Sequence, residues 1–215
     1  MDRQDQIINF LSSASAYADI EGADGLDVQR RETHISVVFL VGQSAFKMKR
    51  AVAYPYLDFS TLDRRRELCE REITINSRTA PDIYRGVIAV TCNAKGEFAL
   101  DGDGDPVEWL VSMHRFDDAT LWDRQALAGD LDRHDFEVLA DQVARFHAKA
   151  ETCDGDAAVS ALAATIDGNR QSMASHTGDL FDFEMVEALF SRTRKAYELA
   201  KPVLQTRANE GCVRI

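Results

Sequence analysis

A lysine in a strand-like segment and a glutamate in the helix-like segment after it are the residues whose types and spacing best suit chemistry. Lys47 is a charged side chain within the pattern of a buried strand, and Glu72 lies on the apolar stripe of its helix. An ammonium group held by a carboxylate can bind the oxygens of an anion such as a phosphate. The candidate chemistry therefore depends on the elements that position these two residues.

The stretch from Thr33 to Arg50 predicts two β-strands around a turn at residues 42–44. Alternation places one face of this hairpin in the core, with the apolar residues Val37, Phe39, Val41, Phe46 and Met48. Ala45, Lys47 and Lys49 then share the opposite face of the second strand. Lys47 is thus expected to project away from the core residues of its own hairpin.

A helix is predicted from Ser60 to about Thr79, ahead of Pro81. Ser60 is the expected first residue, because Asp63 follows it at the spacing of a capping box. Three charged residues of this helix have charged neighbours at i±3 and i±4, which is typical of a solvated face: Glu67, Glu70 and Arg71.

Glu72 departs from this charged face. Leu68 lies four residues before it and Ile75 three residues after it, so its side chain should point toward the sheet. A carboxylate in such a place needs a partner, because an unpaired buried charge is costly. Lys47 is the natural partner; the alternative is a partly exposed glutamate beside an unrelated surface lysine.

Strands dominate the first half of the chain and helices the second half. Besides the hairpin, strands are predicted at residues 26–30, 87–92, 97–100 and 107–113. Helices are also predicted at residues 3–18, 132–150, 157–173 and 180–200. Asp132 and Asp179 are the expected N-caps of the second and fourth of these helices, and Pro202 is expected to end the fourth. This order predicts an α+β fold with an N-terminal lobe at residues 1–113 and a helical lobe at residues 114–215.

The composition excludes several classes of protein. The 215 residues are 45% hydrophobic, which is enough for one large domain or two small lobes. The net charge of −11 argues against a broad nucleic-acid surface. No signal peptide or membrane span is recognisable. We therefore expect a soluble, cytoplasmic protein without nucleic-acid or membrane partners, whose acidity serves solubility or attracts a cationic small substrate.

No metal site is predicted. The cysteines lie far apart without a C-x-x-C spacing, so free thiols are expected: Cys69, Cys92, Cys153 and Cys212. Asp101, Asp103 and Asp105 have the spacing of a calcium loop. However, Pro106 stands where that loop needs glycine and Ser112 where it needs a bidentate glutamate. An acidic turn is the expectation there.

The segments around Lys47 and Glu72 resemble a known family. Residues 45–47 match the A-x-K of the third strand of protein kinases, and Glu72 falls where their helix-C glutamate lies. More specifically, residues 32–87 are similar to bacterial aminoglycoside phosphotransferase-like proteins, which are often fused to a P-loop ATP-binding domain. The similar segments are ETHISVVFLVG, AFKMKR, YPYLDFSTLDRRRELCEREITIN and APDIYRGV, and the likeness continues in VEWLVSMHRF and ARFHAKA.

The resemblance implies a protein-kinase-like fold and a site for ATP with Mg²⁺. Lys47 would contact the ATP phosphates, and Glu72 would orient Lys47. The family function is ATP-dependent phosphoryl transfer to a hydroxyl group of a small molecule, and catalysis depends mainly on positioning and charge neutralisation. The identity of that small molecule does not follow from the family name.

The resemblance also implies roles for two backbone segments. The turn from Thr33 to Ser36 would replace the nucleotide-covering loop, although it lacks G-x-G-x-x-G; its alternative is an ordinary polar turn. Residues 112–115, which include Met113 and His114, would form the hinge whose backbone groups bind adenine. The alternative for this segment is simply the exit from a strand.

The catalytic loop of the family has no counterpart in this sequence. Phosphoryl transfer needs a loop Asp, an Asn five positions later and a further Asp for Mg²⁺. The sequence contains neither H-x-D-x-x-x-x-N nor HGD, and the family resemblance places that loop after a segment like ANEGCVRI, where the chain stops. His176 and Asp179 form a similar string with one extra residue, but Asp179 suits a helix N-cap. We therefore assign no catalytic and no metal-binding residue, and we expect a truncated C-terminal lobe.

Two functions remain open at this point. One is a phosphotransferase whose catalytic loop is missing from this chain, and the other is a non-catalytic nucleotide-binding or interaction module. Truncation would expose the apolar faces of the helices at 157–173 and 180–200, so self-association is expected. His147, on the apolar face of its helix, is expected to be a core histidine.

Overall fold

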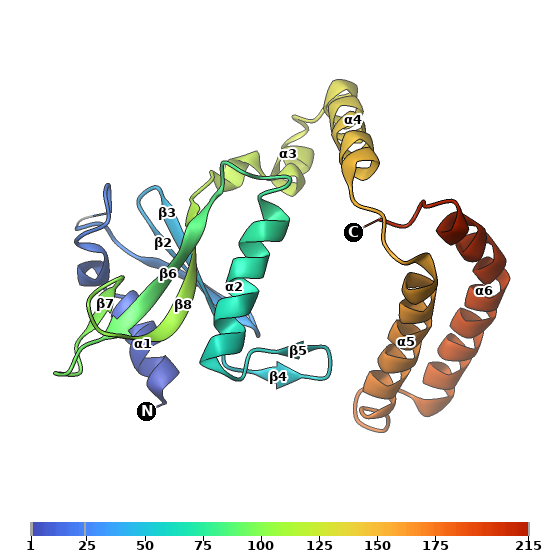
Figure 1. Cartoon of the computed structure of the whole chain (residues 1–215), viewed down its shortest axis with the longest axis horizontal. Coiled ribbons are helices and arrows are strands. Elements are labelled where there is room, and N and C mark those ends of the chain that lie inside the picture. Colours follow the sequence, from blue (N-terminus) through green and yellow to red (C-terminus); the bar gives the residue numbers. More distant parts are fainter. Residues whose placement is uncertain (1, 24, 215) are drawn as a thin grey trace. The chain divides into compact units, whose positions relative to one another are not determined.

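The computed structural model of the chain describes residues 2–23 and 25–214. These residues fall into two compact units, which adjoin in the sequence between Leu131 and Asp132. The first unit contains an antiparallel sheet with helices, and the second consists mainly of helices (Figure 1). The chain is therefore α+β, as the sequence predicts.

Six antiparallel strands form the sheet of the first unit, in the order β1-β2-β3-β8-β6-β7. Their bounds are Gln29–Glu32 (β1), Ser36–Val41 (β2), Ser44–Lys49 (β3), Tyr84–Cys92 (β6), Phe98–Leu100 (β7) and Asp105–His114 (β8). The predicted hairpin is confirmed as β2 and β3, with Val38 opposite Lys47. The strand expected at residues 26–30 begins later, at Gln29. The Leu26 N–H donates to the Ala23 carbonyl at 3.3 Å and is therefore not available to the sheet.

One face of the sheet forms the hydrophobic core with α1 (Arg3–Leu11) and the 3₁₀ helix η1 (Ala14–Tyr17). The alternating residues that the sequence places on this face are buried, and Ile7, Leu11 and Tyr17 belong to the same cluster. The Tyr17 hydroxyl donates to the Leu11 carbonyl at 2.7 Å, and the Tyr17 ring lies 5.2 Å from that of Phe46.

The single helix predicted at residues 3–18 is wrong, since α1 and η1 are separate. The Ser12 hydroxyl donates to the Ile8 carbonyl at 2.7 Å, and Ser13 has extended backbone angles. Serine side chains compete with the helix for backbone groups in this way, which explains why the helix ends here. The interruption lets Tyr17 turn into the core.

A small second hairpin precedes α2 (Leu62–Asn76): β4 (Ala53–Tyr54) pairs with β5 (Leu57–Asp58). Pro55 stands in its turn, where a proline does not interrupt a ladder. The expectation that Ser60 begins α2 is wrong, because Thr61 is the N-cap and accepts from the Arg64 N–H. The N–H and the hydroxyl of Ser60 both donate to the Asp58 carboxylate, at 2.9 and 2.6 Å. α2 packs against β8 and β6 (Figure 1).

The first unit ends with η2 (Asp118–Thr120) and α3 (Trp122–Ala128). Gly129 closes α3 in the left-handed region, at φ 78°. The second unit comprises α4 (Arg133–Lys149), α5 (Gly155–Ala174) and α6 (Phe183–Asn209). Asp132 is the N-cap of α4, as predicted, and its carboxylate accepts from the N–H groups of His134 and Asp135.

Both predicted ends of the last helix are wrong. The N-cap of α6 is Asp182, whose carboxylate accepts from the Met185 N–H at 2.9 Å, whereas Asp179 lies in the preceding turn. Pro202 lies inside α6. A proline cannot donate to the carbonyl four residues earlier, but the remaining ladder carries the helix past it.

Apolar side chains are exposed on all three helices of the second unit. None of the described residues of α4 is buried, and the expected core histidine, His147, is exposed. The apolar stripe that should have buried this histidine is itself uncovered, which explains why that prediction is wrong. The exposed apolar residues include Phe136, Leu139, Val143, Leu162, Leu189 and Leu199.

Among residues 2–23 and 25–214, no helix has both the length and the hydrophobicity needed to span a membrane.

Candidate functional site

The predicted contact between the strand lysine and the helix glutamate is present. Lys47 Nζ donates to Glu72 Oε1 at 3.0 Å. Lys47 is opposite Val38 on one side and Val111 on the other, so it projects from the centre of the sheet. α2 supplies Glu72 from the face of the sheet that the core does not occupy. Alternation along β3 and the apolar spacing on α2 were together sufficient to predict this pair.

A second lysine, which the sequence analysis did not assign, binds the same carboxylate. Lys49 Nζ donates to Glu72 Oε2 at 2.6 Å and lies 5.1 Å from the centre of the Phe59 ring. Glu72 therefore has a cation on each of its oxygens. The signal was available, because Lys49 is two residues from Lys47 and so shares its face of the strand.

The electrostatics of Glu72 are set by burial against two cations. Burial alone raises the pKa of this carboxyl group, but the hydrogen bond and charge of Lys49, with those of Lys47, outweigh it and lower the pKa below its ordinary value. Glu72 is therefore a carboxylate at neutral pH. Two ammonium groups and one carboxylate leave this cluster with a net positive charge, which suits an anionic ligand.

A second polar cluster fixes the N-terminal part of α2. Arg65 Nε donates to Glu108 Oε1 on β8 at 2.7 Å, and a second guanidinium nitrogen donates to the Phe59 carbonyl at 3.0 Å. The amide nitrogen of Gln4 donates to Glu108 at 2.8 Å and to the Lys49 carbonyl at 3.0 Å. Helix α1, strand β3 and helix α2 are thus tied together beside the lysine cluster.

An apolar row crosses the sheet two register steps from Lys47, on the same face. Leu40, Ala45 and Met113 are partners across β2, β3 and β8, and the next row on the same face contains Lys47. Met113 therefore lies on the same face of the sheet as Lys47, while Leu40 and Ala45 are buried. This arrangement places an apolar surface beside a cation, which suits a ligand that carries both a flat ring and a negative charge.

The turn from Thr33 to Ser36 lies at the other end of the lysine strand. Ser36 is the register partner of Lys49. The Thr33 N–H donates to the Ser36 carbonyl at 2.9 Å, and the two hydroxyl oxygens lie 3.1 Å apart. The Ser36 N–H also donates to Thr33 Oγ1, at 3.1 Å. The polar groups of Thr33 and Ser36 thus already bind one another, as in a tight polar turn.

The backbone donors of the expected hinge are also engaged. The His114 N–H donates to the Ile83 carbonyl at 2.8 Å, and the Arg115 N–H donates to the Gln43 carbonyl at 2.8 Å. The His114 ring nitrogen Nδ1 lies 2.8 Å from an Arg85 guanidinium nitrogen, so it accepts that hydrogen bond. Lys47 and Glu72 are thus brought together, whereas His114 is the register partner of Ser44 and has its side chain on the other face of the sheet from Lys47.

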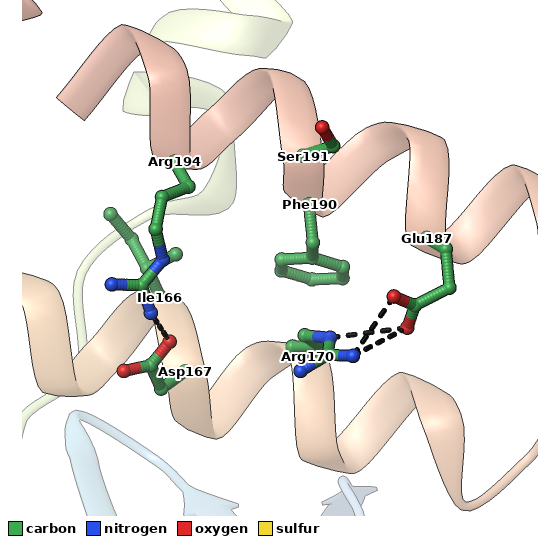
Figure 2. Close-up of a pocket in the computed structure, with 7 residues that line it drawn as sticks. All are labelled: Ile166, Asp167, Arg170, Glu187, Phe190, Ser191 and Arg194. Atoms are coloured by element: carbon green, nitrogen blue, oxygen red, sulfur yellow. Dashed lines mark hydrogen bonds and ion pairs between the residues drawn. The ribbon is translucent and has the colours of Figure 1, made fainter. Parts of the chain in front are cut away.

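Other polar clusters have structural explanations. A pocket between α5 and α6 contains two arginines, and each is neutralised by a carboxylate of the other helix (Figure 2). Arg170 binds both oxygens of Glu187 at 2.9 Å, and Arg194 binds Asp167. Phe190 packs between the two pairs. These pairs hold the two helices together and leave no net charge for a ligand.

The acidic turn behaves as expected. Asp101 has φ 47°, and its carboxylate accepts from the Ala89 N–H at 2.7 Å, so it closes the turn beside β6. Across residues 2–23 and 25–214, no group of three or more His, Cys, Asp or Glu side chains could hold a metal ion. The four cysteines are free thiols.

Comparison with known proteins finds relatives without a known activity. The chain is 27% identical over 186 residues to uncharacterized proteins of Mycobacterium tuberculosis and Mycobacterium bovis. The match covers 85% of this chain and 36% of each relative, so the chain spans about a third of the length of the curated relatives it matches. No family model matches the chain. No solved structure matches it either.

Proposed function

We propose that the first unit is the nucleotide-binding part of a protein-kinase-like phosphotransferase, of the aminoglycoside phosphotransferase-like kind. The observation that carries this proposal is the 3.0 Å ion pair between Lys47 on β3 and Glu72 on the helix that follows. Protein kinases use a strand lysine held by a helix glutamate to bind the α- and β-phosphates of ATP. Lys47 is the proposed phosphate ligand, and Glu72 is its orienting partner.

The residues beside the pair fit the rest of an ATP molecule. The apolar row of Leu40, Ala45 and Met113 would accept the adenine ring, two register steps from the cation that binds the phosphates. The net positive charge of the lysine cluster favours a polyphosphate over a neutral ligand. Bound ATP would bring Mg²⁺ with its phosphates, and we assign no residue of this chain to that metal.

The whole protein would transfer the terminal phosphoryl group of ATP to a hydroxyl of a small molecule. The sequence of this chain contains no H-x-D-x-x-x-x-N or HGD string. We therefore propose that these 215 residues bind the nucleotide without turnover. Catalysis of the transfer would need an Asp base and metal ligands that this chain does not provide.

A second candidate is a non-catalytic interaction module with little affinity for nucleotide. The observation that favours it is the engagement of the backbone groups that should cover the nucleotide or bind its adenine. The Thr33 N–H and the His114 N–H both donate within the protein, at 2.9 and 2.8 Å. These donors become available only if the turn or the strand end opens.

Calorimetric titration of the 215-residue chain with ATP and Mg²⁺ separates the two candidates. The first predicts saturable binding that Lys47→Met weakens by at least about tenfold, the size of a lost hydrogen bond to a charged group. Lys95→Met is the matched control, because Lys95 is an exposed lysine in the turn between β6 and β7. Binding that is absent in the wild type, or equal in the Lys47 and Lys95 variants, would leave the interaction module as the better account.

A further inference from the structure

The two lysines that bind Glu72 differ in how far their side chains are exposed to solvent. The Lys49 side chain is only 6% exposed, whereas that of Lys47 is 31% exposed. The shorter contact is also that of Lys49, at 2.6 Å against 3.0 Å. Lys47 therefore has an open side toward solvent, and Lys49 does not.

The surroundings of Lys49 hold it in place. Its ammonium lies 5.1 Å from the centre of the ring of Phe59, which is itself buried. Its backbone carbonyl accepts from Gln4, and its register partner Ser36 is buried. A lysine in these surroundings cannot leave the carboxylate without losing both a desolvated ion pair and a cation–π contact.

The difference in exposure between Lys47 and Lys49 matters when an anion binds. A phosphate that draws Lys47 away would leave a lone carboxylate on Glu72, which is 13% exposed, if Lys47 were its sole partner. Breaking a buried pair in this way opposes ligand binding, because the remaining charge is uncompensated. Lys49 removes the conflict, since Glu72 keeps one cation while Lys47 changes partner.

We infer that Lys49 is a positioning residue that keeps Glu72 neutralised and fixed in place while Lys47 binds a phosphate of the nucleotide. This inference rests on the proposed function and assigns a separate role to each lysine. Lys47 is the mobile ligand, and Lys49 is the permanent partner of the carboxylate. Lys49 does not touch the nucleotide.

A double-mutant cycle on the 215-residue chain separates this role from simple packing. ATP is titrated with Mg²⁺ into wild type, Lys49→Met, Glu72→Gln and the double variant. Lys49→Met should weaken ATP binding by at least about tenfold when Glu72 is present. In the Glu72→Gln background the same change should cost less than about twofold, because no carboxylate remains to be neutralised. Lys49→Arg, which keeps the charge, should restore part of the loss.

Equal losses in both backgrounds would overturn the inference, because they would mean that Lys49 acts by packing. A second cycle measures urea unfolding midpoints and does not need a ligand. Lys49→Met should lower the midpoint more than Lys47→Met does, and Glu72→Gln should remove most of that difference. An equal or smaller effect of Lys49→Met overturns the inference as well.

The two proposals fail in different ways. If the wild type does not bind ATP, the proposed function is wrong, and the unfolding cycle alone decides the role of Lys49. If Lys49→Met does not fold but the double variant with Glu72→Gln does, the uncompensated carboxylate is the cause and the inference is supported. If neither folds, the charge of Glu72 is not the reason, and the inference is overturned.

Discussion

Arg65 on α2 donates its Nε–H to the Glu108 carboxylate on β8 at 2.7 Å, and both side chains are buried. This pair connects the helix that carries Glu72 to the middle of the sheet. Glu108 also accepts from Gln4, so its second oxygen is satisfied. The position of the proposed phosphate site along the sheet therefore depends on a buried charge that lies outside it.

Removing one partner of this pair should destabilise the first unit strongly. Arg65→Met leaves the Glu108 carboxylate buried without a cation, with only the N–H donors of Gln4 and Trp109. A broken buried pair costs about 3 to 5 kcal/mol. Chemical denaturation monitored by circular dichroism measures the loss. Arg66→Met is the control with a smaller expected loss. It removes an exposed i,i+4 pair with Glu70 worth roughly 0.3 to 0.5 kcal/mol and a cation–π contact with Trp109 worth about 0.5 to 1 kcal/mol. Similar losses for the two variants would contradict the burial of Arg65.

The stability of the protein should depend on the charge of Glu72 in acid. Its pKa is lowered from an ordinary 4.5 in the folded state, so the stabilisation it provides is fully present above that value. The stabilisation is lost as the pH falls through the lower, folded pKa. The difference in unfolding free energy between wild type and Glu72→Gln should be largest at neutral pH and should shrink toward pH 3. Glu70→Gln, at an exposed position, should show no such trend.

Cys69 should be the least reactive of the four thiols. It is fully buried on α2, and burial raises its pKa to about 11, so almost no thiolate is present at pH 8. In the native protein a disulfide reagent should label Cys212, which is exposed, and should leave Cys69 unlabelled until urea unfolds the chain. Mass spectrometry of the labelled peptides identifies the sites. Rapid native labelling of Cys69 would mean that α2 does not stay on the sheet.

Replacing Pro202 should stabilise the last helix. Pro202 lies inside α6, where proline costs about 3 kcal/mol relative to alanine in an exposed helix interior. Pro202→Ala should therefore raise the stability of the second unit and slightly increase the helical circular dichroism signal. Lys201→Ala, the neighbouring change, should alter stability by less than about 0.5 kcal/mol. A helix that stopped at Pro202 would show no gain from the proline substitution.

The isolated chain should self-associate through the helices of the second unit. Leu199 on α6 is 73% exposed and Leu189 is 48% exposed. Large exposed apolar side chains favour association. Light scattering over a range of concentrations should show a rising mass, and Leu199→Glu should reduce it. A constant monomeric mass would contradict this expectation.

The elements and contacts that follow from a local pattern were predictable, and those that depend on distant partners were less so. Alternation on β3 and the stripe on α2 predicted the pair of Lys47 and Glu72 correctly. The sequence did not assign Lys49, because alternation gives the face of a strand but not which of two lysines reaches a given carboxylate. The cap of α2 shifted to Thr61 because Ser60 binds Asp58, a contact across a turn that a capping pattern does not include.

The second unit was harder to predict for a different reason. Apolar periodicity placed α4 and α5 closely, but it assumed that an apolar stripe is a buried one. His147 is exposed because the stripe beside it is uncovered. Pro202 shows that a proline does not always mark the end of a helix. It destabilises α6, but the helix continues because the other backbone hydrogen bonds are retained.

The side chain of Gln4 limits how far the protein can be shortened for experiments. Its amide accepts from the Ala51 N–H at 2.9 Å and donates to Glu108 and to Lys49, so a residue near the start of the chain completes the polar network around the lysine strand. Removing Gln4 by truncation should therefore disturb the lysine cluster from the opposite face of the sheet. Replacing residues of α1 should have the same effect. Affinity tags are therefore better placed after α6.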